Sequence, residues 1–110
     1  MNKNTLDEIE AKIRDAESIG EPRKRELLQL LDTLKSEVAR LSRTHGEQAQ
    51  SIAGFAQLSA HEATRAQQNP QSLHHSLEGL RASVEGFEKS HPQLVQIVTN
   101  ICNRLANIGF

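Results

Sequence analysis

Five histidines are the residues of this chain best suited to metal binding or proton transfer, so their spacing is a first test for chemistry. They stand at positions 45, 61, 74, 75 and 91. His61-Glu62 begins as a zinc-protease motif does, but the position of that motif's second histidine holds Arg65. The single cysteine, Cys102, is distant in sequence from the histidines. We therefore expect no metal site and no cofactor.

Motifs for phosphate binding or nucleophilic catalysis do not stand out either. The six glycines are scattered and form no phosphate-binding loop, and no serine, histidine and acid have a spacing that differs from chance. Neighbouring carboxylates such as Asp7 and Glu8 belong to an evenly charged helical surface, which indicates a solvated face. We therefore expect that the protein is not an enzyme.

One stretch, HHSLEGLRASV from His74 to Val84, has a pattern compatible with phosphate chemistry. When its leucines face a core, His75 projects outward, and Gly79 one turn later leaves room around the imidazole. This pattern resembles the phosphoacceptor helix of histidine-phosphotransfer domains, which implies His75 as the phosphoacceptor. Glu78 stands where those domains usually carry a lysine, so a phosphorylated His75 would face a carboxylate. We favour the alternative interpretation, two exposed histidines on an amphipathic helix.

Helices must position these residues, because apolar side chains recur at spacings of three and four along the chain. We predict helices over residues 5–19, 22–45, 47–68, 71–89 and 92–108. Thr5 and Glu8 form a capping-box pattern at the first helix start, and Gly20 supplies its C-terminal stop. Proline at 92 separates the last two helices, since the residue before a proline is disfavoured in a helix.

Heptad-spaced apolar seams run along three of the predicted helices. They comprise residues 27, 31, 34, 38 and 41, then 73, 77, 80, 84 and 87, then 94, 98, 101, 105 and 108. The sequence therefore predicts an all-α fold, an antiparallel helical bundle with coiled-coil-like heptad seams and four to five helices. We expect residues 1–110 to form a single domain.

The Ala- and Gln-rich stretch from Glu47 to Gln71 is the least specified part of the chain. Continuing the seam of the preceding helix would bury Phe55, Ser59 and Ala66, among others. Residues 22–67 form either one helix or two, and we favour a break or bend at Gly46. Because the stretch has few large apolar side chains, we expect it to be a weakly packed helix or a mobile excursion.

Composition bears on partners and location. The formal net charge of -1 gives no electrostatic reason to expect nucleic acid. The N-terminus is polar and acidic, and no run of about eighteen apolar residues is present, so we expect neither a signal peptide nor a membrane span. A lone cysteine favours a reducing compartment. We expect a soluble, cytoplasmic protein.

The C-terminal half has a recognisable pattern. It consists of the helix LEGLRASVEGFE followed by FEKSHPQLVQIVTNICNRLANIGF, with an F-E, an H-P and a terminal I-G. This pattern resembles a family of short bacterial all-helical proteins catalogued only as a domain of unknown function. The Leu- and Glu-rich opening over residues 6–41 also fits that family, whereas residues 42–72 look like an insertion. The resemblance implies a helical fold and no particular activity.

The function is therefore expected to be association. We expect a non-enzymatic helical module for self-assembly or docking to a partner helix, with phosphotransfer at His75 as the alternative. The last predicted helix carries more apolar surface than one antiparallel partner would cover, which favours a homodimer. The expected interface consists of Leu94, Val98, Ile101, Leu105 and Ile108.

Overall fold

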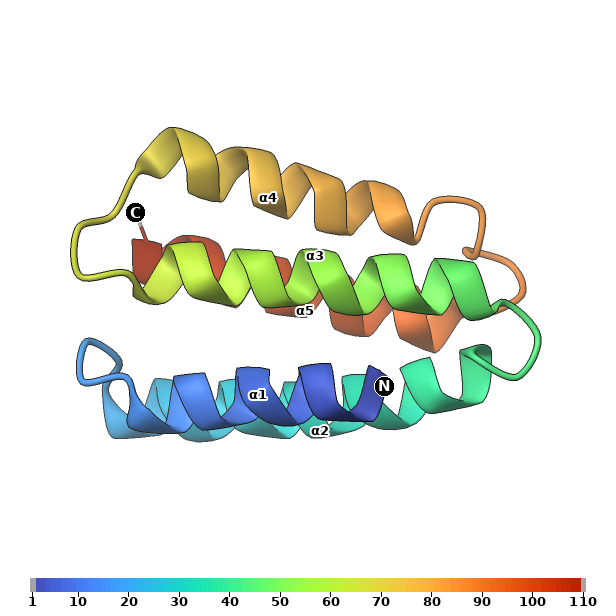
Figure 1. Cartoon of the computed structure of the whole chain (residues 1–110), viewed down its shortest axis with the longest axis horizontal. Coiled ribbons are helices and arrows are strands. Elements are labelled where there is room, and N and C mark those ends of the chain that lie inside the picture. The colour runs from blue at the N-terminus through green and yellow to red at the C-terminus, as the bar shows by residue number, and fades with distance from the viewer. Residues whose placement is uncertain (1, 110) are drawn as a thin grey trace.

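The computed structural model describes residues 2–109, with side chains described for residues 5–108. This part of the chain forms five helices and no strand (Figure 1), which confirms the all-α prediction. Each helix runs antiparallel to the next along the long axis of the bundle. The helices are α1 (Asn2–Asp15), α2 (Glu21–Leu41), α3 (Gly46–Thr64), α4 (Pro70–Ser83) and α5 (Pro92–Gly109).

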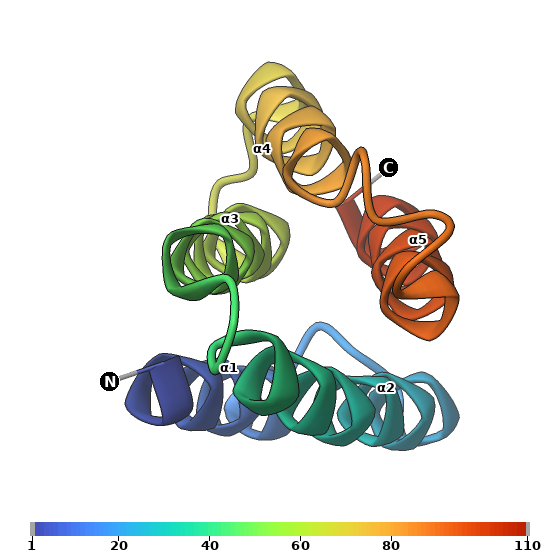
Figure 2. The same ribbon diagram turned by 90° about the vertical axis from the view of Figure 1, so that its right-hand side faces the viewer.

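The helices form two layers, which Figure 2 shows end-on. One layer contains α1, α3 and α4, with α3 in the middle, and the other contains α2 and α5. α3 contacts all four other helices, because it lies between α1 and α4 and also packs on both helices of the second layer. The core therefore lies around α3.

The central position of α3 contradicts the expectation that residues 47–71 pack weakly. Its inner face carries the buried Ile52 and several small side chains that are also buried: Ala49, Ala53, Ala56, Ala60 and Ala63 are at most 2% exposed. Alanine favours the helix and lets neighbouring backbones approach closely, so a helix with few large apolar groups can still be well packed. The expectation was wrong because it counted large side chains only.

A break before Gly46 confirms that residues 22–67 form two helices. α2 ends at Leu41, and the N-cap of α3, His45, has φ -134° and ψ 63°. The continued seam predicts part of the burial, since Ile52 and Ser59 are buried. Phe55 is exposed, and Ala66 lies beyond the end of α3 and is exposed too.

The first helix differs from the prediction at both ends. α1 begins at Asn2, so Thr5 lies inside its first turns and not at its N-cap. It ends at Asp15, and Gly20 is the N-cap of α2 and not the stop of α1. The carbonyl of Arg14, left unpaired by the helix end, accepts a hydrogen bond from Lys24 Nζ at 2.8 Å.

The connection between α4 and α5 is a separate turn, as the proline at 92 predicted. α4 ends at Ser83, earlier than expected, and Gly86 has a φ of 95° that favours glycine. Phe87 stays buried although it lies outside the helix. At the other end of α4, the side chain of Asn69 caps the helix by accepting from the backbone N–H groups of Gln71 and Ser72.

Candidate interaction surface

The residues expected to form an interface lie mainly inside the single chain. Leu94, Val98, Ile101 and Leu105 are at most 2% exposed, and Ile108 is partly buried against the core. α5 contacts α2, α3 and α4, so three neighbours cover the apolar arc that seemed too wide for one partner. These four side chains are not available to a second copy while the bundle is folded in this way.

Cys102 on α5 is also a packing residue. Its side chain is fully buried, and Sγ lies 3.9 Å from the carbonyl oxygen of Leu77 on α4. Burial disfavours the thiolate and raises the pKa of the Cys102 thiol to about 11. At neutral pH the group is therefore a neutral thiol with no nucleophilic role.

His75 projects outward, as its position on the helix predicted. Its side chain is 72% exposed, and Nδ1 lies 3.7 Å from Glu78 Oε1, while Nε2 of His74 lies 3.4 Å from the other oxygen of Glu78. Gly79 does not serve to open access to this imidazole. The ring of Phe55 from α3 occupies the space beside Gly79, where a Cβ would lie only 2.4 Å from Phe55 Cε1. The glycine is therefore explained by helix packing.

Two other histidines close one end of the bundle with Phe87. The ring centroid of Phe87 lies 5.4 Å from those of His45 and His91, and the two imidazoles are 6.0 Å apart, all in edge-to-face arrangements. Ser90 Oγ lies 2.9 Å from His91 Nδ1. Within the described residues, no group of three histidine, cysteine or acidic side chains is placed to hold a metal ion.

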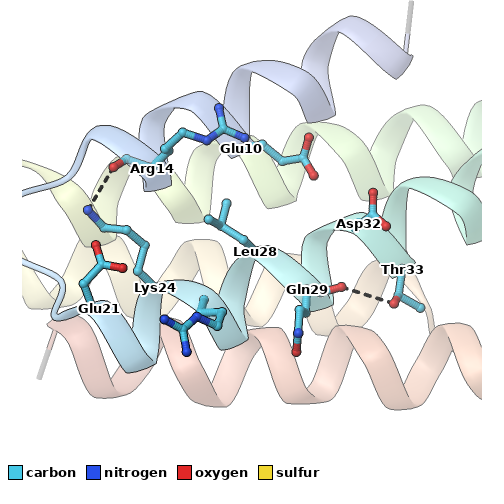
Figure 3. Close-up of a pocket in the computed structure, with 9 residues that line it drawn as sticks. Glu10, Arg14, Glu21, Lys24, Leu28, Gln29, Asp32 and Thr33 are labelled. Carbon is cyan, nitrogen blue, oxygen red and sulfur yellow. Dashed lines mark hydrogen bonds between the residues drawn. The ribbon is translucent and has the colours of Figure 1, made fainter.

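An open groove lies between α1 and α2 (Figure 3). Leu28 points into it, and its rim carries three acidic and three basic side chains: Glu10, Glu21, Asp32, Arg14, Lys24 and Arg25. Lys24 is engaged with the Arg14 carbonyl, as the dashed line shows. Because the charges balance and the groove is open, it favours no particular class of small ligand.

The outward side of α3 has the features of a contact surface. Six exposed residues follow one another there at spacings of 4, 3, 4, 3 and 4, five of them within α3 and the last at its C-cap: Glu47, Ser51, Gly54, Leu58, His61 and Arg65. We call this set the α3 outer face. Leu58 at its centre is 44% exposed, and Phe55 beside it is 37% exposed; among the described residues these are the exposed large hydrophobic side chains. A groove toward α1 borders this face at His61 and Arg65, and a groove toward α4 borders it at Ser51.

The spacing of the residues on the α3 outer face is visible in the sequence, but an apolar seam does not mark it. This spacing is that of a heptad, yet a single large apolar residue occupies the face. Only the structure distinguishes this stripe from the inner one, because α3 has neighbours on three sides and solvent on the fourth.

The described residues place the protein in the class of all-α five-helix bundles, and they contain no metal-binding cluster. The chain belongs to the family described as Domain of unknown function (DUF4404), which matches residues 27–110. The match confirms the resemblance read from the C-terminal half. The match begins within α2, so of the opening over residues 6–41 it covers only residues 27–41. It also includes residues 42–72. No curated protein and no solved structure matches the chain.

The family carries no assigned function, in agreement with the expectation from the sequence. None of the described helices combines the length and the apolar character needed to cross a bilayer.

Proposed function

We propose that this protein is a non-enzymatic helical association module whose docking surface is the α3 outer face. The observation that carries the proposal is the exposure of Leu58, which is 44% accessible at the middle of that face. Fully burying a leucine contributes about 1.5 to 3 kcal/mol. A second helix lying along α3 would bury Leu58 and the exposed part of Phe55 together.

The surface on either side of the α3 outer face suits a helix better than a small molecule. The two grooves beside α3 run toward α1 and α4 and are lined by mixed polar and apolar side chains. Small-molecule sites are usually concave and mostly apolar, whereas helix docking needs a long shallow surface with few anchors. A homodimer is the simplest such assembly, because a two-fold axis uses one patch twice.

Sedimentation equilibrium from micromolar to millimolar protein tests the proposal. We expect the wild type to approach the mass of a dimer and Leu58→Asp to remain a monomer with an unchanged helical circular dichroism spectrum. Ala39→Asp is the matched control, since Ala39 is exposed on α2 in the other layer. A wild type that stays monomeric over the whole range would contradict self-association.

A further inference from the structure

We infer that the occupant of the α3 outer face is a second copy of this chain, with the two α3 helices antiparallel and Leu58 of each copy packed on Gly54 of the other. This inference rests on the proposed function and adds the partner, the orientation and the register. Three features of the face support it: a notch beside a knob, matching charges, and one register that satisfies both.

Gly54 provides the notch. A Cβ built on Gly54 meets no atom of the described residues within 4 Å, and the φ of Gly54 is not positive. Within that part of the chain, neither space nor backbone conformation requires a glycine there. Glycine is the least favourable residue after proline in a helix interior. Its presence in the exposed middle of α3 is explained when another helix approaches closely at that point.

Leu58 provides the knob, one helical turn beyond Gly54 on the same stripe. Around a two-fold axis that crosses the helix between them, Leu58 of each copy faces Gly54 of the other, so both contacts form at once. Such an interface is isologous and closes at two copies. Two apolar knobs entering two notches resemble the knobs-into-holes packing of antiparallel helices.

The same register matches the charges at the ends of the face. When Gly54 faces Leu58, Glu47 of one copy comes opposite Arg65 of the other, and Ser51 comes opposite His61. A parallel arrangement would instead place Glu47 beside Glu47 and Arg65 beside Arg65. Charge complementarity of this kind fixes orientation more than it adds affinity.

Arg65 is the C-cap residue of α3, and it pairs with a carboxylate of its own chain. Its Nη1 lies 2.9 Å from Glu62 Oε1 on the same chain, and its side chain remains 38% exposed. A guanidinium has five N–H donors, so this bond leaves donors for a carboxylate of the second copy. The face is one helix wide, which corresponds to a small interface, and we expect a dissociation constant in the micromolar range.

Gly54→Leu tests whether Gly54 receives the partner's Leu58, and the thermal midpoint of the monomer separates this effect from misfolding. The new side chain points into open solvent in the monomer but fills the site of the partner's Leu58 in the dimer. We expect dimerisation at least tenfold weaker, together with a thermal midpoint of the monomer that is not lowered. Ala39→Leu adds the same kind of side chain to α2 in the other layer and should leave dimerisation unchanged.

Charge reversal tests the register. Glu47→Arg and Arg65→Glu each place like charges across the interface and should weaken the dimer several-fold, whereas the double variant restores two opposite pairs and should recover most of the affinity. Helical circular dichroism of each variant serves as the folding control. A parallel pair would show no such recovery.

The outcomes distinguish self-association from the antiparallel geometry of the dimer. A monomeric wild type at millimolar concentration would overturn both the self-association and its geometry. A wild-type dimer that tolerates Gly54→Leu, or whose charge variants show no mutual rescue, would overturn the inference alone. Dissociation by Gly54→Leu together with rescue in the double variant is the result that we expect.

Discussion

The ring of Phe55 on α3 lies over Gly79 on α4, so closely that a Cβ on Gly79 would be 2.4 Å from Phe55 Cε1. The two helices are therefore joined by a ring lying against bare backbone. Phe55 is partly exposed, and its ring fills the space that the missing side chain of Gly79 leaves.

This contact predicts that Gly79→Ala changes the free energy of unfolding in opposite directions when Phe55 is present and when it is replaced by alanine. Gly79→Ala should lower the free energy of unfolding by about 1–3 kcal/mol in the wild type, because the methyl group and the ring cannot share the space. In the Phe55→Ala background the same change should raise it by about 0.5–1 kcal/mol, because alanine is the better helix former. Urea denaturation of the wild type, the two single variants and the double variant measures this double-mutant cycle. Equal effects in both backgrounds would contradict the contact.

Removing the hydroxyl group of Ser59 should stabilise the protein. Ser59 is fully buried, and its Oγ has no hydrogen-bond partner among the residues that the structure describes. Since an unsatisfied buried polar group costs about 1–3 kcal/mol, Ser59→Ala should raise the free energy of unfolding by roughly 1 kcal/mol. Ser76→Ala is the control, because Ser76 Oγ donates to the Leu73 carbonyl at 2.8 Å. Loss of stability in Ser59→Ala would indicate that the hydroxyl is paired.

Amide exchange should protect α3 as strongly as α5. The sequence predicts the opposite, since residues 47–71 have few large apolar groups, but α3 contacts every other helix and its inner alanines are buried. Central, well-packed helices open only in near-global unfolding. Hydrogen exchange followed by mass spectrometry on monomeric Leu58→Asp separates this effect from protection by a partner. Fast exchange throughout α3 would disprove its central role.

Alkaline pH should destabilise the fold through Cys102. Burial raises the pKa of its thiol from 9.0 to about 11, so the unfolded chain ionises first. Below pH 9 the thiol of Cys102 makes its full contribution to the free energy of unfolding. As the pH rises toward 11, this contribution falls by about 2 kcal/mol. Urea denaturation of the wild type and Cys102→Ala across this range measures it. The wild type should lose more stability than the variant; parallel losses would mean that the thiol is solvated.

His75 should remain unmodified by a small phosphodonor. A phosphoryl group on its exposed imidazole would lie close to the Glu78 carboxylate, which already lies 3.7 Å from Nδ1. After incubation with acetyl phosphate, we expect no acid-labile adduct at His75 by mass spectrometry at neutral pH. Glu78→Lys is the informative comparison, because it supplies the charge that phosphotransfer domains use. A stable adduct on the wild type would revive the phosphotransfer interpretation.

The sequence alone determined the number of helices and the places where the chain breaks between them, but not every helix end. Apolar spacings of three and four, the proline at 92 and Gly46 predicted helices and breaks, because these signals act within a few residues of themselves. The end of α4 was missed, since Phe87 continues the heptad seam although the backbone has left the helix.

Only the tertiary structure decided which face of each helix meets a neighbour. The seam of α5 looked like an interface, but α2, α3 and α4 cover it within one chain. The alanines of α3 looked like weak packing, but they let α3 lie at the centre and leave Leu58 on the outside. Periodicity gives the direction of an apolar stripe along one helix, whereas its partner depends on long-range packing of all five helices together.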